Sequence, residues 1–410
     1  MAGGGGFETA ATRPPQPPVR GNPGEVFLAF LKLGVTSFGG PVAHLGYFRT
    51  EFVERRRWLS DAAYAELVAL CQFLPGPASS QVGMAIGLQR AGWLGLLAAW
   101  FAFTMPSAIL LVAFAAGAGT LADVAGTGWI GGLKAAAVAV VAIAVMQMAR
   151  SLAPDARRAT IAVLALAAVL LLPSPFVQLA AIAAAALLGL AWLREPELGD
   201  DTAFSIRVGR GAAIACLAGF VLLLVGLPIL VALTQDPTLR LVDVFTRAGS
   251  LVFGGGHVVL PLLEAELVPT GLVGHDAFLA GYGAAQAVPG PLFTFAAYLG
   301  AVMQSGPSGP LGAAIALLAI FLPSALLVVG ALPFWTRLRG SRLARRALLG
   351  VNAAVVGILA AALYHPVFTA GITSVRALVL AAGAFVALLA WRAPPWAVVI
   401  GAALVGWLVL

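Results

Sequence analysis

Apolar stretches of roughly twenty residues recur along this chain from about residue 93 onward, and few polar residues separate them. A helix needs about twenty such residues to cross the hydrocarbon core of a bilayer. The spans expected from this pattern lie approximately at 93–118, 130–149, 159–173, 176–193, 211–233, 311–333, 347–364, 374–391 and 395–410. The pattern therefore predicts an all-α polytopic membrane protein.

Glycine and proline interrupt four further apolar segments, which lie near residues 27–42, 62–90, 245–262 and 277–304. Proline lacks a backbone donor and ends helices, and glycine relaxes the backbone. Non-helical backbone at membrane depth is tolerated where it is buried in protein or lines a wet cavity. We therefore expect these segments to be broken helices or re-entrant hairpins.

The interrupted segments form two matching sets. The stretch "FLKLGVTSFGGPVAHL" at Phe30–Leu45 aligns with "FTRAGSLVFGGGHVVL" at Phe245–Leu260, and "QFLPGP" from Gln72 aligns with "QAVPGP" from Gln286. The blocks "MPSAIL" and "LPSALL" follow in the same order. Self-similarity over several ordered blocks predicts a duplicated unit.

The duplication divides the chain into four parts. The first residues are rich in glycine and proline and have no apolar core, which is typical of a disordered tail. The expected parts are this tail at 1–24, a first repeat at 25–195, a connecting segment with one transmembrane helix at 196–240, and a second repeat at 241–410.

Equivalent loops of the two repeats carry opposite charge bias. Residues 43–60 include four arginines, whereas their counterpart, 263–276, has acidic residues and no Lys or Arg. After the Pro-Ser-Ala blocks the bias reverses, because 337–346 includes five arginines and 119–128 includes none. Cytoplasmic loops carry the excess of Lys and Arg, so this pattern predicts inverted-topology repeats, related by an odd number of spans.

The composition leaves no room for a separate soluble domain, because 61% of the 410 residues are hydrophobic and 10% are charged, against about 25% charged in soluble domains. The net charge of +7 comes largely from arginines at the ends of spans, which indicates topology anchoring and no nucleic-acid partner. The cysteines and histidines lack metal-ligand spacing, and no nucleotide-binding or hydrolase motif occurs. We expect a secondary carrier that is not an enzyme and needs no metal or cofactor.

The breaks supply candidate substrate-binding positions. Proline suits the first turn of a helix, and a helix N-terminus presents free N–H groups and a positive dipole end to an anion. Transporters built from inverted repeats bind substrate between the repeats. The candidate backbone positions are Gly39, Gly40, Pro41, Pro75, Gly76, Pro77, Gly254, Gly255, Pro289, Gly290 and Pro291.

Two pairs of side chains accompany the breaks. Lys32 and Arg247 share a repeat position just before the glycine breaks. They would either attract an oxyanion to a central site or extend to the membrane interface as long side chains do at helix ends. Gln72 and Gln286, before the Pro-Gly-Pro triplets, would either donate to substrate oxygens or satisfy freed backbone groups.

Proton coupling has two candidates. Glu66 is a carboxylate in an apolar segment and lacks an acidic counterpart in the second repeat, so it is either a coupling residue or a headgroup-level neighbour of Asp61. His257 follows three glycines and would either titrate near neutral pH or serve as an ordinary hydrogen-bonded side chain.

The glycine-break and Pro-Gly-Pro motifs of both halves resemble the paired signatures of the chromate ion transporter family, and the resemblance covers the chain from about residue 25. The length is similar to the long members, whose two halves are homologous and oppositely oriented. At position 256 the second half has glycine where the first has Pro41, so the two sites need not be equivalent.

The resemblance implies a secondary active transporter that exports chromate across the bacterial inner membrane, driven by the membrane potential or a proton gradient, and confers chromate resistance. It implies substrate contact at Lys32, Arg247, Gln72, Gln286 and the Gly and Pro positions above. Expected partners are chromate or a sulfate-like oxyanion, the lipid bilayer and a second copy in a homodimer. The alternative is a transporter of sulfate or another oxyanion. An enzyme acting on lipid phosphates is disfavoured because no catalytic cluster occurs.

Overall fold

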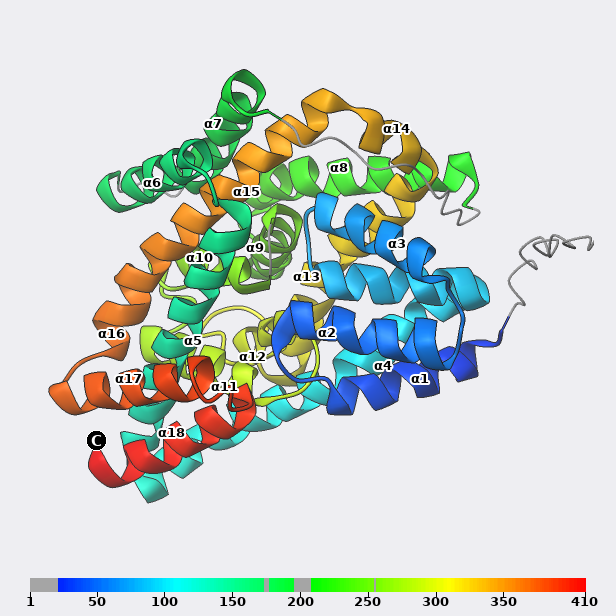
Figure 1. Ribbon diagram of the computed structural model, residues 1–410. Helices are drawn as coiled ribbons and strands as arrows, with labels where there is room; N and C mark the ends of the chain where they lie inside the picture. Colours follow the sequence, from blue (N-terminus) through cyan, green and yellow to red (C-terminus); the bar gives the residue numbers. More distant parts are fainter. Residues whose placement is uncertain (1–20, 173–176, 195–207, 254–255) are drawn as a thin grey trace, which may run out of the picture.

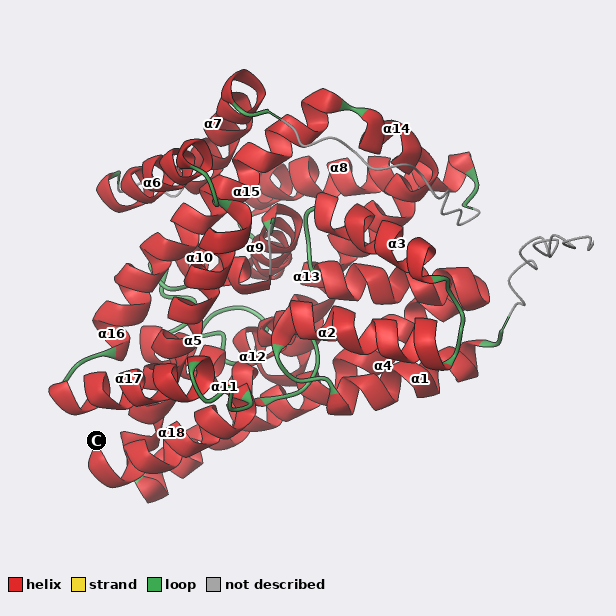
Figure 2. Ribbon diagram, viewed as in Figure 1, coloured by secondary structure: helices red, strands yellow, loops and turns green. Residues whose placement is uncertain are grey.

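The computed structural model describes residues 21–172, 177–194, 208–253 and 256–410, and every regular element in these ranges is helical (Figures 1 and 2). Most of the expected N-terminal tail, part of the connecting segment and the candidates Gly254 and Gly255 lie outside the described residues. The all-α membrane architecture is confirmed, because the described helices are long and apolar.

Within the described ranges, five helices are long and apolar enough to cross a membrane, and each matches an expected span. They are α4 (Ala78–Ala125), α5 (Gly128–Leu152), α8 (Arg210–Thr234), α13 (Gly309–Ala331) and α15 (Arg342–Ala362). Helix α8 joins the repeats, and 6% of its most apolar window is buried. Its side chains therefore face the surroundings of the protein, as expected for a helix in lipid.

The four other expected spans are also helical, within three residues of the expected bounds: α6 (Ala156–Leu171), α7 (Val177–Trp192), α17 (Val375–Leu389) and α18 (Pro395–Val409). A helix of 15 or 16 residues is about 24 Å long at 1.5 Å per residue, less than the hydrocarbon thickness of about 30 Å. That each forms a full span therefore stays a prediction. Asp155 and Ser374 cap the N-termini of α6 and α17.

These short helices form two matching pairs. Arg157 donates from Nη1 to the Trp192 carbonyl at 2.9 Å, and Arg376 donates to the Val409 carbonyl at 3.0 Å. Each arginine lies at the start of the first helix and caps the end of the second, where a cation is favoured. Each pair is therefore antiparallel, and the number of crossings it contributes is even whether or not it spans the membrane.

The repeats exchange these pairs. Helices α6 and α7 of the first repeat pack on α15 of the second, and α17 and α18 of the second pack on α5 of the first (Figure 1). Glycines allow backbone contact at both interfaces: Gly357 lies against the Ala162 carbonyl and Gly132 against the Ala402 carbonyl. Small residues are favoured where membrane helices pack closely. The two repeats are thus intertwined in space although they are consecutive in sequence.

All four expected breaks are present. The glycine breaks separate α1 (Pro23–Thr36) from α2 (Gly40–Arg49), and α9 (Pro237–Leu251) from α10 (Val259–Leu267). The Pro-Gly-Pro breaks separate α3 (Asp61–Phe73) from α4, and α11 (His275–Ala287) from α12 (Phe295–Ala301). The remaining short elements are η1 (Thr50–Arg55), η2 (Gly256–Val258), η3 (Leu292–Thr294), η4 (Leu332–Phe334), α14 (Trp335–Gly340), η5 (Leu363–Phe368) and α16 (Thr369–Gly371).

Helix α4 turns sharply at Ala91 and Gly92, so its first leg folds back on its second. A Cβ on Gly87 would lie 2.3 Å from the Gly95 carbonyl oxygen, which means that the two legs touch through their backbones. In the second repeat α12 meets α13 in the same way, with Gly300 against the Gly312 carbonyl. The repeat relation seen in the sequence therefore extends to the packing.

Candidate substrate site at the crossing of four breaks

Each Pro-Gly-Pro break is bonded to the glycine break of the other repeat. The Gly76 N–H donates to the Val252 carbonyl at 2.6 Å, and the Gly290 N–H donates to the Ser37 carbonyl at 2.9 Å. Gly76 matches Gly290 in the repeats, and Ser37 matches Val252. The two hydrogen bonds are therefore related by pseudo-two-fold symmetry, and they satisfy backbone groups that the broken helices leave free.

The two glycine breaks also meet each other, on the pseudo-two-fold axis. A Cβ on Gly256 would lie 3.1 Å from Cγ of Pro41, its own repeat counterpart. Two counterparts can touch only where the axis passes between them. A second proline at 256 would crowd this contact, which gives a physical reason for glycine at that position.

The central glycines of both triplets have backbone conformations that other residues rarely adopt, with φ of 119° at Gly76 and 95° at Gly290. A Cβ at Gly76 would lie 2.4 Å from Ser324 Oγ, and one at Gly290 would lie 2.9 Å from Ser107 Oγ. Ser107 and Ser324 are the serines of the repeated Pro-Ser-Ala blocks. The repeated blocks are visible in the sequence, but the role of their serines is not. Their position against the Pro-Gly-Pro breaks appears only in the folded structure.

The candidate cations are held in matching ion pairs. Lys32 Nζ lies 3.4 Å from Glu51, and Arg247 Nη1 lies 3.0 Å from Glu266, which is the repeat counterpart of Glu51. Lys32 and Arg247 each precede the break by more than a helical turn, and each forms ion pairs with carboxylates that lie outside the breaks. The structure therefore brings the two cations to equivalent positions beside the crossing, each with a bound carboxylate.

The two ion-pair clusters differ in charge. Arg55 and Arg56 also contact Glu51, at 3.6 Å and 2.8 Å, so three cations surround one carboxylate and the net charge is +2. Burial acts to raise the pKa of Glu51, but hydrogen bonds from Arg56 and Lys32 outweigh it and lower the pKa, so Glu51 is a carboxylate. In the second repeat Asp243 joins Arg247 at 2.9 Å, and the cluster of Arg247, Asp243 and Glu266 has a net charge of −1.

The two candidate glutamines lie in different surroundings. Gln72 is exposed, whereas Gln286 is partly buried and its Nε2 has no hydrogen-bond partner among the described residues. The role of satisfying freed backbone belongs to Gln81, which donates to the Pro75 carbonyl at 2.8 Å. In the second repeat Thr294 donates to the Pro291 carbonyl at 2.7 Å.

The coupling candidates lie in separate parts of the molecule. His257 Nδ1 is 2.7 Å from the Tyr282 hydroxyl, so this histidine is hydrogen-bonded to α11. Glu66 lies on α3 and is 8% exposed, which places it within the packed first repeat.

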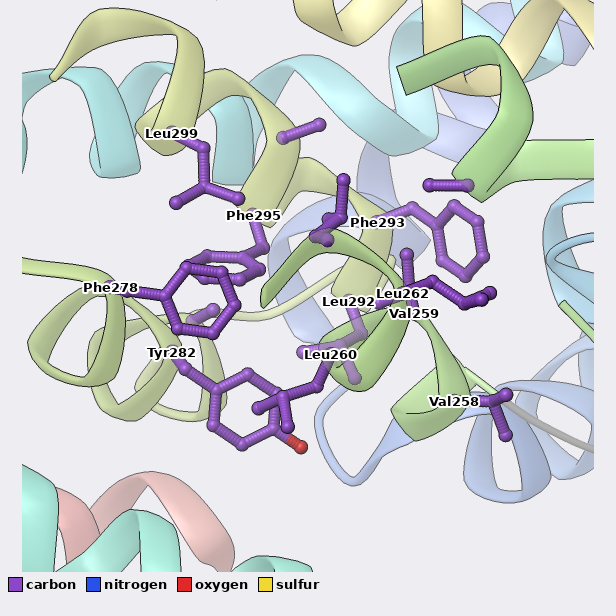
Figure 3. Packing of buried hydrophobic residues seen from close by; sticks show 14 of the residues in the cluster. Val258, Val259, Leu260, Leu262, Phe278, Tyr282, Leu292, Phe293, Phe295 and Leu299 are labelled. Atoms are coloured by element: carbon purple, nitrogen blue, oxygen red, sulfur yellow. The ribbon is translucent and has the colours of Figure 1, made fainter. Parts of the chain in front are cut away.

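Buried polar atoms gather on the first-repeat side of the crossing. Among the described residues, the following have no hydrogen-bond partner: Ser37 Oγ, His44 Nε2, Ser80 Oγ, Gln81 Oε1, Thr104 Oγ1 and Ser324 Oγ. The second-repeat counterparts of the first five are Val252, Val259, Thr294, Phe295 and Phe321. Figure 3 shows Val259 and Phe295 within an apolar cluster that also includes Leu292, Phe293 and Tyr282.

Comparison with known families and proteins agrees with this two-repeat arrangement. The family model described as a chromate transporter matches residues 24–190 and 239–407. The chain is 29% identical over 382 residues to the chromate transport protein of Pseudomonas aeruginosa, covering 86% of this chain and 83% of that protein. It is 28% identical over 350 residues to the probable chromate transport protein of Synechococcus elongatus, covering 81% of each.

A comparison with solved structures found no match. The family assignment therefore depends on sequence, and it is carried by a match that occurs once in each repeat and covers most of the chain. The relatives above are matched over more than four fifths of their length. On this basis the chain belongs to the chromate transporter family.

Proposed function

We propose that this protein is a secondary active transporter that exports chromate from the cytoplasm across the bacterial inner membrane, driven by the membrane potential or a proton gradient, and that it confers chromate resistance. The observation that carries the proposal is the reciprocal crossing of four broken helices. Broken helices at a repeat interface are where secondary transporters bind their substrates.

The helices that begin at the crossing support binding of an anion. Helix α2 begins after Gly39 and α4 begins after Pro77, and neither has a side-chain cap at its N-terminus. Uncapped N–H groups and the positive end of the helix dipole favour an oxyanion.

An inverted arrangement of the repeats supports alternating access. The arginine-rich loops fall on one side if the second repeat is upside down relative to the first. Whether the number of membrane crossings between the repeats is odd or even depends on α8 and the long helices, because each short helix pair contributes an even number of crossings. Inverted repeats give a transporter two related conformations that open to opposite sides.

We propose that Lys32 and Arg247 provide positive potential beside the site, and that the Gly and Pro positions of the breaks, with Gln72 and Gln286, lie along the substrate path. Lys32 has a side chain that is 54% exposed, so it is available to attract an anion from water. Glu66 and His257 are the proposed coupling residues.

The test of this function is uptake of radiolabelled chromate into inverted membrane vesicles that contain the protein. We expect accumulation in energised vesicles and its loss when an uncoupler collapses the gradient. Vesicles from cells without the protein are the control. Absence of accumulation above this control would refute chromate export.

The second candidate is transport of sulfate or another tetrahedral oxyanion. Chromate and sulfate share shape and charge, and the uncapped helix ends at the crossing favour both. Excess sulfate in the same vesicles distinguishes the two: weak competition favours chromate as the preferred substrate, and strong competition together with direct sulfate uptake favours the wider class.

A further inference from the structure

The buried polar side chains at the crossing lie mostly in the first repeat, although the backbone contacts of the crossing are nearly two-fold symmetric. Ser37, His44, Thr104 and Ser324 are each at most 1% exposed, and each has a polar atom without a partner among the described residues. Leaving such a group buried and unpaired costs about 1–3 kcal/mol. Unpaired buried groups at both crossing breaks indicate a site that a ligand completes.

Contacts connect several of these groups to the first turns of α2 and α4. Ser324 Oγ and Gln81 Nε2 both border Gly76, at 2.4 Å and 2.9 Å from the position that a Cβ would take. His44, on α2, has Nδ1 3.4 Å from Ser79 Oγ, on the first turn of α4. Ser37 lies at the glycine break just before α2, and Ser80 follows Ser79.

We propose that the transported oxyanion binds at a single site displaced from the symmetry axis into the first repeat. Its ligands are uncharged donors: the hydroxyls of Ser37, Ser80 and Ser324 and the imidazole of His44. This inference rests on the proposed function and names the site of the same substrate. We assign the His44 tautomer in which Ser79 donates to Nδ1, so that Nε2 carries the proton and donates to the anion.

Uncharged donors suit a carrier. Hydrogen bonds from hydroxyls to an anion are stronger than neutral pairs, and the uncapped helix N-termini add favourable dipole potential. A site of this kind binds a dianion without the strong hold of a buried cation, so the substrate can leave on the other side. Lys32, Arg55 and Arg56, which share Glu51 within the same repeat, add positive potential on the first-repeat side and attract the anion.

The second repeat lacks such a site. Its counterparts of His44, Gln81 and Thr104 are apolar, and its cluster around Arg247 has a net charge of −1. An oxyanion placed there would meet Val259 and Phe295 in the apolar cluster of Figure 3, and Gln286 Nε2 is the buried side-chain donor without a partner that the described residues of that break supply. We therefore expect one oxyanion bound per chain, not two.

The chain offers a matched pair of variants for the test. Ser324 and Ser107 are counterparts in the Pro-Ser-Ala blocks and both are fully buried. The Ser107 hydroxyl donates to the Thr104 carbonyl at 3.1 Å, whereas Ser324 Oγ has no partner among the described residues. Ser324→Ala therefore removes a proposed ligand, and Ser107→Ala removes a hydroxyl that is already satisfied.

The experiment measures the binding of radiolabelled chromate to the purified full-length protein in detergent by equilibrium dialysis. Chromate uptake into vesicles is measured alongside. For Ser324→Ala and Ser80→Ala we expect chromate binding roughly 10- to 100-fold weaker, from loss of a hydrogen bond to a charged group. Ser107→Ala, the matched control, should bind as the wild type does. The binding stoichiometry should be one per chain.

Wild-type affinity in both Ser324→Ala and Ser80→Ala would overturn the proposed site, as would two equal sites per chain. If Ser324→Ala does not fold, as judged by gel filtration, Ser80→Ala decides. If the wild type transports chromate and both variants transport it equally well, this site is refuted and the proposed function stands. A wild-type protein that neither binds nor transports chromate or sulfate refutes both.

Discussion

Replacing Gly76 with alanine tests whether the crossing of the breaks is a packed junction that tolerates no side chain. The residue has φ of 119°, and its Cβ would lie 2.4 Å from Ser324 Oγ and 2.9 Å from Gln81 Nε2. Backbone strain at such a position costs about 1–3 kcal/mol. Overpacking in a dense core adds about 1–3 kcal/mol more. We expect a total of about 2–6 kcal/mol.

Gly40→Ala is the matched control. Gly40 also has a positive φ, 77°, but a Cβ there has no atom within 4 Å. The control therefore carries the backbone strain without the crowding. Thermal unfolding in one detergent, followed by tryptophan fluorescence, compares the two variants with the wild type. Gly76→Ala should have clearly the lower melting temperature.

The same variant should lose transport. A shift of Gly76 away from its neighbours would break the 2.6 Å hydrogen bond to Val252, which connects the two repeats. Adding Ser324→Ala to Gly76→Ala removes the nearest clashing atom and should recover part of the melting temperature. Equal stability of the Gly76→Ala and Gly40→Ala variants would refute the crowded junction.

Three further predictions concern the ion pairs and the breaks. Arg247→Ala should destabilise the protein by about 3 kcal/mol or more, because it leaves the buried Asp243 without its cation. Lys32→Ala should cost under about 1 kcal/mol of stability, because Glu51 keeps its ion pair with Arg56. Chemical denaturation measures both variants, and equal losses of stability would contradict this prediction. Changing residues 75–77 to three alanines should heal the helix and abolish chromate uptake while the protein still inserts, and unchanged uptake would remove the case for exposed helix ends. The folded-state pKa of Glu51 is lowered, so its ion pairs stabilise the protein at pH values above the ordinary carboxyl pKa of about 4.3 and lose this effect as pH falls through the lowered pKa. Glu51→Gln should therefore flatten the acid side of a plot of melting temperature against pH. An unchanged plot would speak against the role of this carboxylate.

The sequence predicted the positions of the breaks closely, because helix interruption is local chemistry. Glycine and proline act on their own residue and its neighbours, so α2 and α4 begin within a few residues of the expected positions. The short pairs were also predicted closely, because the N-caps Asp155 and Ser374 set where α6 and α17 begin, within three residues of the expected starts.

The sequence by itself determined the duplication, the membrane environment and the broken backbone, since each is written in local composition and in order along the chain. Tertiary structure alone decided which break meets which. The exchange of Pro-Gly-Pro and glycine breaks between repeats, and the pairing of Lys32 with Glu51, join residues through contacts that no spacing rule contains. The one-sided polar lining is visible in the sequence as Ser-Ser-Gln at 79–81 against Phe-Thr-Phe at 293–295. Its meaning emerges when folding buries these groups together, because burial makes an unpaired donor costly and therefore significant.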